Sequence, residues 1–334
     1  MTINSNYILF FTMTIISTLI TISSNNWLGM WMGLEMNLMA FIPLISKSKN
    51  MKTSQGMMIY FLTQSIGSII LLMSILMSML ITITPMFVNE LIKGLIIISL
   101  LLKMGAAPFH MWFPEMMSKL NWKECCMLTT WQKVGPMMVL NNIYPNNWMI
   151  YLSIILSTII GAIGGLNQTS LRKIMAYSSI NHMGWMLAVM SVKTLWYKYL
   201  IVYAIIVSMT MLYFNYNNIY FINQLISSSK SMMEKYTYVT LMMSMGGLPP
   251  FLGFLPKLLT IQIMINTNLM WLLVVMSAFS LITLFYYLRL MSSMILSYST
   301  INKWMMHQEP NKALLYMMMM VNLSLPMMST LNFF

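Results

Sequence analysis

Long runs of apolar residues, separated by short polar clusters, fill almost the whole chain. A membrane-spanning helix needs about 20 mainly apolar residues. Dividing the chain at its polar clusters and prolines predicts eleven such segments. They cover residues 6–24, 26–46, 55–80, 88–118, 122–142, 148–167, 171–192, 195–215, 237–265, 269–294 and 313–333. We therefore expect an all-α polytopic membrane protein with about eleven transmembrane helices.

Two of these segments, 88–118 and 237–265, are too long for one plain span and carry prolines inside. Proline removes a backbone donor and clashes with the preceding turn. Carbonyl groups that lose their partners inside a membrane must be satisfied by neighbouring helices, side chains or water. The pattern therefore predicts two broken helices, each with polar backbone exposed at mid-membrane.

The order of the segments indicates an internal repeat. If residues 1–25 form a separate first transmembrane helix, residues 26–167 hold spans 2 to 6 and residues 168–334 hold spans 7 to 11. The broken helix is third in each group. Five is odd, so the second group enters the membrane from the opposite face. The pattern thus predicts the inverted repeat of many ion-coupled transporters, whose sites lie at helix breaks.

Composition supports the membrane class and indicates an origin. With 59% hydrophobic and 7% charged residues, the chain lacks the polar surface of a soluble protein. No cleavable signal or transit pattern precedes the first apolar run, so we expect the first span to be retained. The 45 methionines, with many lysines, two arginines and no aspartate, are typical of an AT-rich genome that reads an extra codon as Met. We infer mitochondrial encoding.

Basic residues are distributed unevenly between the two predicted faces. Connections after spans 2, 4, 6, 8 and 10 hold eleven Lys and Arg residues, against two, Lys193 and Lys198, on the other face. This positive-inside bias predicts the N-terminus on the matrix side and the C-terminus on the intermembrane-space side. The net charge of +12 then reflects orientation and contact with anionic phospholipid such as cardiolipin, not nucleic-acid binding.

Four charged residues lie inside otherwise apolar spans: Glu35, Lys103, Lys133 and Lys257. A charge at the bilayer centre costs from roughly 2.5 to more than 10 kcal/mol, so such residues usually mark ion or proton pathways. A buried ammonium group gives up its proton more readily than an exposed one. We expect Glu35 to pair with Lys103, and the lysines to take up and release protons. The alternative is structural ion pairing.

Two histidines are further candidates. His110 follows the first break, and His182 lies in the middle of the 171–192 span. Histidine titrates near neutral pH and can pass protons between waters. Each could equally be a hydrogen-bonded packing residue. The scattered histidines and the adjacent Cys125 and Cys126 show no metal-ligand spacing.

Several stretches together carry a resemblance to a known family: residues 27–43, 101–114, 130–136, 161–173, 178–185 and 246–257. In them the chain resembles the mitochondrially encoded chain 2 subunits of NADH:ubiquinone oxidoreductase (respiratory complex I), and the match is insect-like. The resemblance implies an antiporter-like fold related to Mrp-type cation/proton antiporters, in the mitochondrial inner membrane. It also implies other membrane-arm subunits as partners.

By the same resemblance, Glu35, Lys103, Lys133 and Lys257 match the family's charged residues, and His110 matches a histidine near the first break. The implied function is proton translocation driven by quinone reduction elsewhere. NADH, flavin, iron–sulfur clusters and ubiquinone would then belong to other subunits, with no cofactor, metal or redox centre in this chain. Two alternatives stay open. A stand-alone cation/proton antiporter would exchange sodium or potassium, and a purely structural scaffold would have a dry axis around its lysines.

Overall fold

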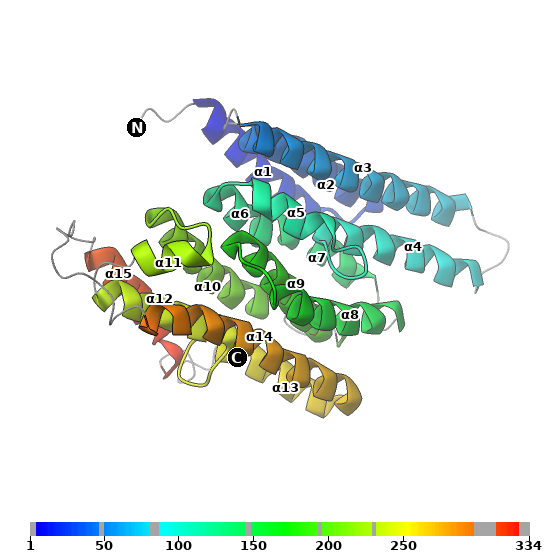
Figure 1. Ribbon diagram of the computed structural model, residues 1–334. Helices are drawn as coiled ribbons and strands as arrows, with labels where there is room; N and C mark the ends of the chain where they lie inside the picture. Colours follow the sequence, from blue (N-terminus) through cyan, green and yellow to red (C-terminus); the bar gives the residue numbers. More distant parts are fainter. Residues whose placement is uncertain are drawn as a thin grey trace. The chain divides into compact units, whose positions relative to one another are not determined.

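The computed structural model describes residues 5–46, 50–80, 87–143, 148–192, 196–228, 232–296 and 312–326. Within these ranges the regular elements are helices, named α1 to α15 in Figure 1, and a single antiparallel bridge joins Ser170 to Phe221. The expected all-α class is therefore confirmed. The chain divides into two compact units, Met1–Ser153 and Ile154–Phe334, with the boundary inside α8 (Trp148–Gly165).

In the first unit, helices that carry the predicted charged residues pack around α7. The elements are α1 (Ser5–Ser23), α2 (Trp27–Ile45), α3 (Met51–Leu80), α4 (Phe87–Met104), α5 (Trp112–Lys119), α6 (Trp122–Thr129) and α7 (Trp131–Asn142). Helix α7 packs against α1, α2, α4 and α6, while α3 packs against α2, α4 and α5. Side chains from α2, α3, α4 and α7 therefore meet in the interior of this unit.

The second unit is organised around α9, almost all of whose residues are buried. Its elements are α9 (Leu171–Ser191), α10 (Trp196–Tyr216), α11 (Ile222–Ser228), α12 (Met232–Gly246), α13 (Phe254–Asn266), α14 (Met270–Leu296) and α15 (Lys312–Asn322). Helix α9 contacts α10, α13 and α14. Polar side chains on α9 are thus enclosed by three neighbouring helices.

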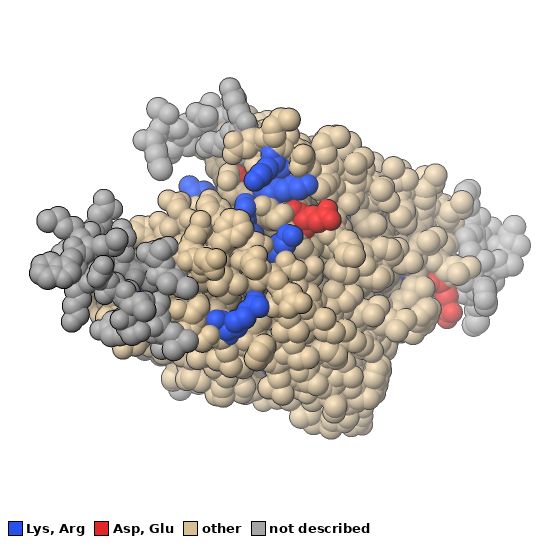
Figure 2. Space-filling view, in the orientation of Figure 1, with Lys and Arg blue, Asp and Glu red and all other residues tan. Residues whose placement is uncertain are grey.

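Within the described residues, five helices are long and apolar enough to cross a membrane: α2, α3, α8, α10 and α14. Their outer faces carry large apolar side chains exposed from the protein, such as Ile69 on α3 and Leu281 on α14. On the face that Figure 2 shows, Lys, Arg, Asp and Glu side chains cover only small areas. Such a surface suits lipid or other apolar helices, because exposed apolar area of this extent is rare on soluble monomers.

Both long segments are interrupted, as the prolines predicted, and both interruptions begin with the same helix-ending turn. Gly105 after α4 and Gly247 after α12 adopt left-handed φ angles of 67° and 72°. The amides of Gly105 and Ala106 bond the carbonyls of Leu102 and Leu101. Those of Gly247 and Leu248 bond the carbonyls of Ser244 and Met243 in the same register. Each first half-helix therefore ends in a Schellman motif, for which glycine has no Cβ penalty.

The structure adds two features that the apolar pattern did not predict. The 122–142 segment is divided at Thr130 into α6 and α7, and the short helix α11 lies in a connection. The end of the predicted 313–333 segment falls outside the described residues, as do five lysines of the charge count: Lys47, Lys49, Lys193, Lys230 and Lys303. The division at Thr130 matters for function because α7 begins just before Lys133.

Candidate functional site

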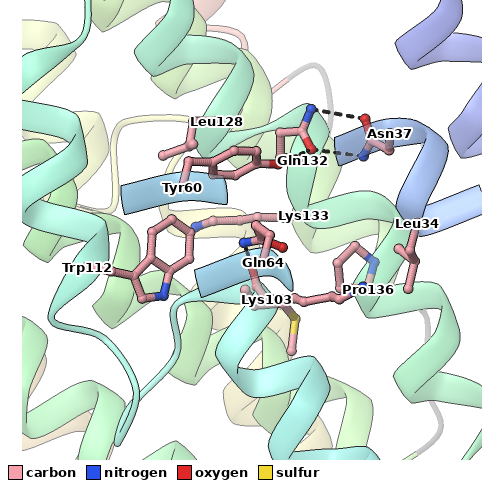
Figure 3. Close-up of a pocket in the computed structure, with 11 residues that line it drawn as sticks. Leu34, Asn37, Tyr60, Gln64, Lys103, Trp112, Leu128, Gln132, Lys133 and Pro136 are labelled. Carbon is pink, nitrogen blue, oxygen red and sulfur yellow. Dashed lines mark hydrogen bonds between the residues drawn. The ribbon is translucent and has the colours of Figure 1, made fainter. Parts of the chain in front are cut away.

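A small polar cavity lies in the first unit, among the helices that meet around α7. Its volume, taken over the positions that the centre of a water molecule can occupy, is about 20 Å³. On that measure roughly 10–15 Å³ is enough for one water. Figure 3 shows its lining, which consists of Leu34, Asn37, Tyr60, Gln64, Lys103, Met104, Trp112, Leu128, Gln132, Lys133 and Pro136. Two of the four predicted charged residues therefore line one water-sized space.

Lys133 enters this cavity from the first turn of α7. Its side chain is 2% exposed, and its Nζ lies 5.5 Å from the centroid of the Phe113 ring. In Figure 3 the amine end points toward Trp112. An aromatic face stabilises a nearby ammonium group by about 0.5–2 kcal/mol, so the aromatic wall partly offsets the cost of burying this charge.

Lys103 enters from the last turn of α4, directly before the first break. Its side chain is 6% exposed. The backbone carbonyls around it are bonded by side chains: Gln64 Nε2 donates to the Lys103 carbonyl at 3.0 Å, and Trp112 Nε1 donates to the Leu102 carbonyl at 3.1 Å. Groups from α3 and α5 thus satisfy the carbonyls that the end of α4 leaves free, as a broken helix inside a membrane requires.

Glu35, on α2, is half-buried and does not line the cavity. Its charge nevertheless acts on both Lys103 and Tyr60. All three residues belong to the described part of the chain, where no nitrogen–oxygen contact within 4.0 Å joins Glu35 to Lys103. The expected partners are therefore in electrostatic range without a direct ion pair, and their functional pairing stays a prediction.

A pair of neutral amides connects α2 to α7 beside the two lysines. Asn37 Nδ2 donates to Gln132 Oε1 at 2.8 Å, and Gln132 Nε2 donates back to Asn37 Oδ1 at 3.1 Å. The Tyr60 hydroxyl donates to the same Gln132 oxygen at 3.2 Å. Figure 3 shows the two amides facing each other. This network joins three helices and fixes α7 at the residue before Lys133.

His110 lies outside this lining. It is 9% exposed, and its Nδ1 is hydrogen-bonded at 3.2 Å to the carbonyl oxygen of Pro108 within the same break. The His110 carbonyl accepts the amide of Phe113 near the start of α5. These contacts give His110 a local role in shaping the break, and its role as a relay stays a prediction.

In the second unit, Lys257 lies at the other break. It is 6% exposed, and its Nζ donates to the Gly246 carbonyl at 2.6 Å, at the end of α12. The same nitrogen lies 5.9 Å from the Trp185 ring centroid on α9. A Cβ on Gly247 would come within 2.7–2.9 Å of the Lys257 side chain, so the lysine lies directly over the unwound glycine.

His182 is 6% exposed and lies one turn of α9 before Trp185. Its Nδ1 is 2.9 Å from the Tyr199 hydroxyl, and its ring centroid is 5.0 Å from that of Tyr203. Its surroundings are therefore polar and aromatic, unlike those of a histidine packed only among aliphatic side chains.

The sequence pattern missed the neutral members of the first site: Asn37, Tyr60, Gln64 and Gln132. Each is a polar residue within an apolar segment, and Gln132 directly precedes Lys133. Uncharged polar residues inside predicted spans were the available signal. Among the described residues, no group of three or more His, Cys, Asp or Glu side chains is placed to hold a metal ion.

Comparison with known proteins identifies the family. Residues 24–283 match the family described as NADH:quinone oxidoreductase/Mrp antiporter, TM. NADH-ubiquinone oxidoreductase chain 2 of Anopheles gambiae is 45% identical over 307 residues, covering 91% of this chain and 90% of that protein. The chain belongs to the NADH-ubiquinone oxidoreductase chain 2 family. The Mus musculus protein of the same name is 37% identical over 333 residues, 96% of each chain.

Solved structures show the same fold at greater distance. A chain of respiratory complex I from Thermus thermophilus, solved with bound aureothin, superposes with a TM-score of 0.86 at 20% identity, over 98% of this chain and 79% of that one. A chain of the Mrp complex from Dietzia gives a TM-score of 0.75 at 16% identity, over 85% of this chain and 59% of that one. These superpositions show that the chain shares its fold with both structures.

Proposed function

We propose that this chain is a proton-translocating membrane-arm subunit of respiratory complex I, NADH:ubiquinone oxidoreductase. The observation that carries the proposal is the joint position of Lys103 and Lys133 on one water-sized polar cavity inside an apolar helical unit. A scaffold has no need for two buried ammonium groups around a shared space, because replacing buried charges by apolar residues is often neutral or stabilising.

In the proposed mechanism, protons pass between amines and water without any redox step in this chain. A charge change elsewhere in the complex alters the interaction of Glu35 with Lys103. The proton affinity of Lys103 then changes, and a proton moves through water between the Lys103 and Lys133 nitrogens. Moving one charge against 100 mV takes about 2.3 kcal/mol. That equals the free energy of a pKa change of under about two units, so modest rearrangements of buried charges suffice.

The proposed topology has eleven membrane spans and two inverted five-helix repeats, as in antiporter-like proteins. It is supported by the matching Schellman motifs at the start of the two breaks and by their sequences. With Gly105 aligned to Gly247, three further identities follow at the same spacing: Pro108 with Pro250, Phe109 with Phe251, and Pro114 with Pro256. Helices that break at matched positions of two halves are typical of transporter folds with a site at each break.

The proposed setting is the mitochondrial inner membrane, with the N-terminus in the matrix and the C-terminus in the intermembrane space. Relatives named as NADH-ubiquinone oxidoreductase chains support this setting, and the distribution of lysines and arginines supports the orientation. NADH, flavin, iron–sulfur clusters and ubiquinone belong to other subunits, and neighbouring membrane-arm subunits are the partners. Basic connections would contact anionic phospholipid such as cardiolipin.

The experiment replaces Lys133 by Met, which retains an unbranched buried side chain without a proton-carrying group. We expect the assembled complex, reconstituted in vesicles, to show a severalfold loss of NADH-driven acidification. Lys52→Ala, at an exposed lysine on α3, is the matched control and should leave acidification unchanged. Normal acidification by an assembled Lys133→Met complex would reject proton transfer at this residue and favour a scaffold.

A further inference from the structure

A cluster of buried tyrosines lies in the second unit, apart from the break that holds Lys257. Tyr199 and Tyr203 come from α10, and Tyr286 and Tyr287 from α14, with exposed fractions of 0%, 2%, 0% and 1%. His182 of α9 joins them, and both α10 and α14 pack against α9. Four phenol groups in the interior of one helical unit are a large concentration of hydroxyls for an apolar environment.

The members of this cluster form two contacting sets that lie within electrostatic range of each other. The Tyr199 hydroxyl bonds His182 Nδ1 at 2.9 Å, and the His182 and Tyr203 ring centroids are 5.0 Å apart. The rings of Tyr286 and Tyr287 have centroids 4.6 Å apart. Tyr287 interacts electrostatically with Tyr199, and Tyr203 does so with Tyr286. The side chains therefore form one group between α9, α10 and α14.

Within the described residues, the hydroxyls of Tyr286 and Tyr287 have no protein partner of ordinary hydrogen-bond geometry. The two hydroxyls approach each other, and the Tyr287 hydroxyl also approaches Ser178 of α9. Nearby on α9, Asn181 Oδ1 is likewise buried without a protein partner. Burying a hydroxyl without a hydrogen bond costs roughly 1–3 kcal/mol by mutational measures. Native proteins bond such groups to ordered water, which needs two to four polar partners.

The cluster extends from one end of the unit toward its middle. Tyr286 packs on Gly165, the last residue of α8, where a Cβ would come within 2.8 Å of the tyrosine ring. Two residues beyond Tyr287, Arg289 donates to the carbonyls of Leu166 and Gln168 in the α8–α9 connection. Tyr286 and Tyr287 therefore lie beside this connection.

The same connection leads into the basic start of α9, at Arg172 and Lys173, which the charge distribution assigns to the positive face. His182 is eleven residues beyond Leu171. At 1.5 Å per residue this is about 16 Å along the helix, near half of a hydrocarbon layer about 30 Å thick. The hydroxyls of Tyr286 and Tyr287 thus lie between the positive face and a histidine at mid-depth.

We propose that Tyr286, Tyr287, Ser178 and water bonded to them form a proton-uptake path from the positive face to His182, with Tyr199 orienting the imidazole ring. This path deepens the proposed function and rests on it. In each transfer an oxygen accepts one proton and releases the proton it already carried, so no tyrosinate forms and each hydroxyl returns to its starting state by rotation. His182 takes up the proton on the ring nitrogen that carries no hydrogen in the neutral imidazole. The cluster contains no carboxylate, and it therefore favours protons over metal cations.

The test is Tyr287→Phe in the assembled complex, with NADH-driven acidification of vesicles as the readout. A hydroxyl on a water path and a dry, unbonded hydroxyl predict opposite results. On the path, its removal lowers acidification severalfold and raises the solvent deuterium isotope effect on pumping. In a dry core, its removal relieves an unsatisfied group, so thermal stability rises and acidification is unchanged. The second result would overturn the proposal.

Tyr213→Phe is the matched control. Tyr213 is 1% exposed in the same unit, and its hydroxyl donates to the Glu234 carbonyl at 3.1 Å, away from His182. It should lower stability while leaving pumping per assembled complex unchanged. An equal loss of pumping in both variants would assign the effect to packing and reject the path.

If Tyr287→Phe fails to assemble, the unsubstituted complex decides the question. A map that resolves ordered water should show density bonded to the Tyr286 and Tyr287 hydroxyls, and a dry cluster would refute the path. The lysine variants separate the two proposals. Loss of pumping in Lys133→Met with normal pumping in Tyr287→Phe would overturn only this path, whereas normal pumping in both would overturn the proposed function as well.

Discussion

Neutral side chains support the charged ones at the first site. Gln132 accepts from both Asn37 and Tyr60 with a single oxygen, and it precedes Lys133 in α7. An amide pair inside a membrane binds two helices without the desolvation penalty of an ion pair. The position of the Lys133 amine therefore depends on uncharged residues of α2 and α3.

Replacing Gln132 by Leu should leave the Asn37 amide and the Tyr60 hydroxyl without their partner. Hydrogen bonds between membrane helices contribute on average about 0.6 and at most about 1.7 kcal/mol, so we expect a loss in that range. Thermal melting of the assembled complex measures it. In a double-mutant cycle, Asn37→Leu should cost much less in the Gln132→Leu background than alone. Additive losses would show that the two amides act independently.

Among individual residues, the charged candidates could be identified from the sequence, whereas the neutral side chains that surround them could not. Lys103 and Lys133 stand out because a charge in an apolar run is costly. Gln64 and Gln132 do not, since an amide is tolerated in a span for many reasons. That Gln64 bonds the backbone carbonyl of Lys103 depends on the packing of α3 against α4.

The two broken helices owe their form to a glycine as much as to the prolines. Gly105 and Gly247 close the Schellman motifs at the ends of α4 and α12. Proline explains why the helix cannot continue, and the left-handed glycine explains how its last carbonyls are bonded. The end of α12 also presents the Gly246 carbonyl to Lys257, which joins the break to the candidate proton carrier.

Neighbouring glycines offer a matched test of this element. Gly247→Ala should lose about 1–2 kcal/mol from the left-handed conformation, with further loss from contact with Lys257. Gly246→Ala should be neutral or stabilising by up to about 1 kcal/mol, because it ends a helix with room for a methyl group. Melting temperatures of the two assembled variants give the comparison. Equal effects would mean that backbone conformation does not determine stability at this break.

The division between α6 and α7 was not predicted, because neither proline nor glycine occurs at Thr130. Two back-bonded threonines lie at the division. The Thr129 hydroxyl bonds the carbonyls of Cys125 and Cys126, and the Thr130 hydroxyl bonds the Cys126 carbonyl. Threonine hydroxyls that bond back one turn commonly bend helices.

For the whole molecule, apolar runs located most helices to within a few residues, as for α9, α10 and α14. They did not show which helix faces pack together. Lipid tails are as apolar as a protein core, so apolar residues cover both the buried and the outer faces of a span. The grouping of α2, α3, α4 and α7 around one cavity needed coordinates.

The proposed orientation predicts opposite labelling of two exposed positions. Asn25→Cys, between α1 and α2, should react with a membrane-impermeant maleimide in mitoplasts, whose intermembrane-space face is open to reagent. Lys52→Cys, at the start of α3, should react only in inverted membrane particles. The native Cys125 and Cys126 lie within α6 and provide the background measurement. Labelling of both positions from one side would contradict the predicted topology.

The bond from Gln64 to the Lys103 carbonyl has a consequence for motion. It holds the main chain of Lys103 in place. The amine is separated from that main chain by four methylene carbons, which are free to change rotamer, and the side chain lines the cavity. We therefore expect a change of the Lys103 rotamer to move the amine between the Glu35 side and the Lys133 side while the main chain stays in place. A rotamer change of one side chain is intrinsically faster than the microsecond-to-millisecond displacement of whole helices.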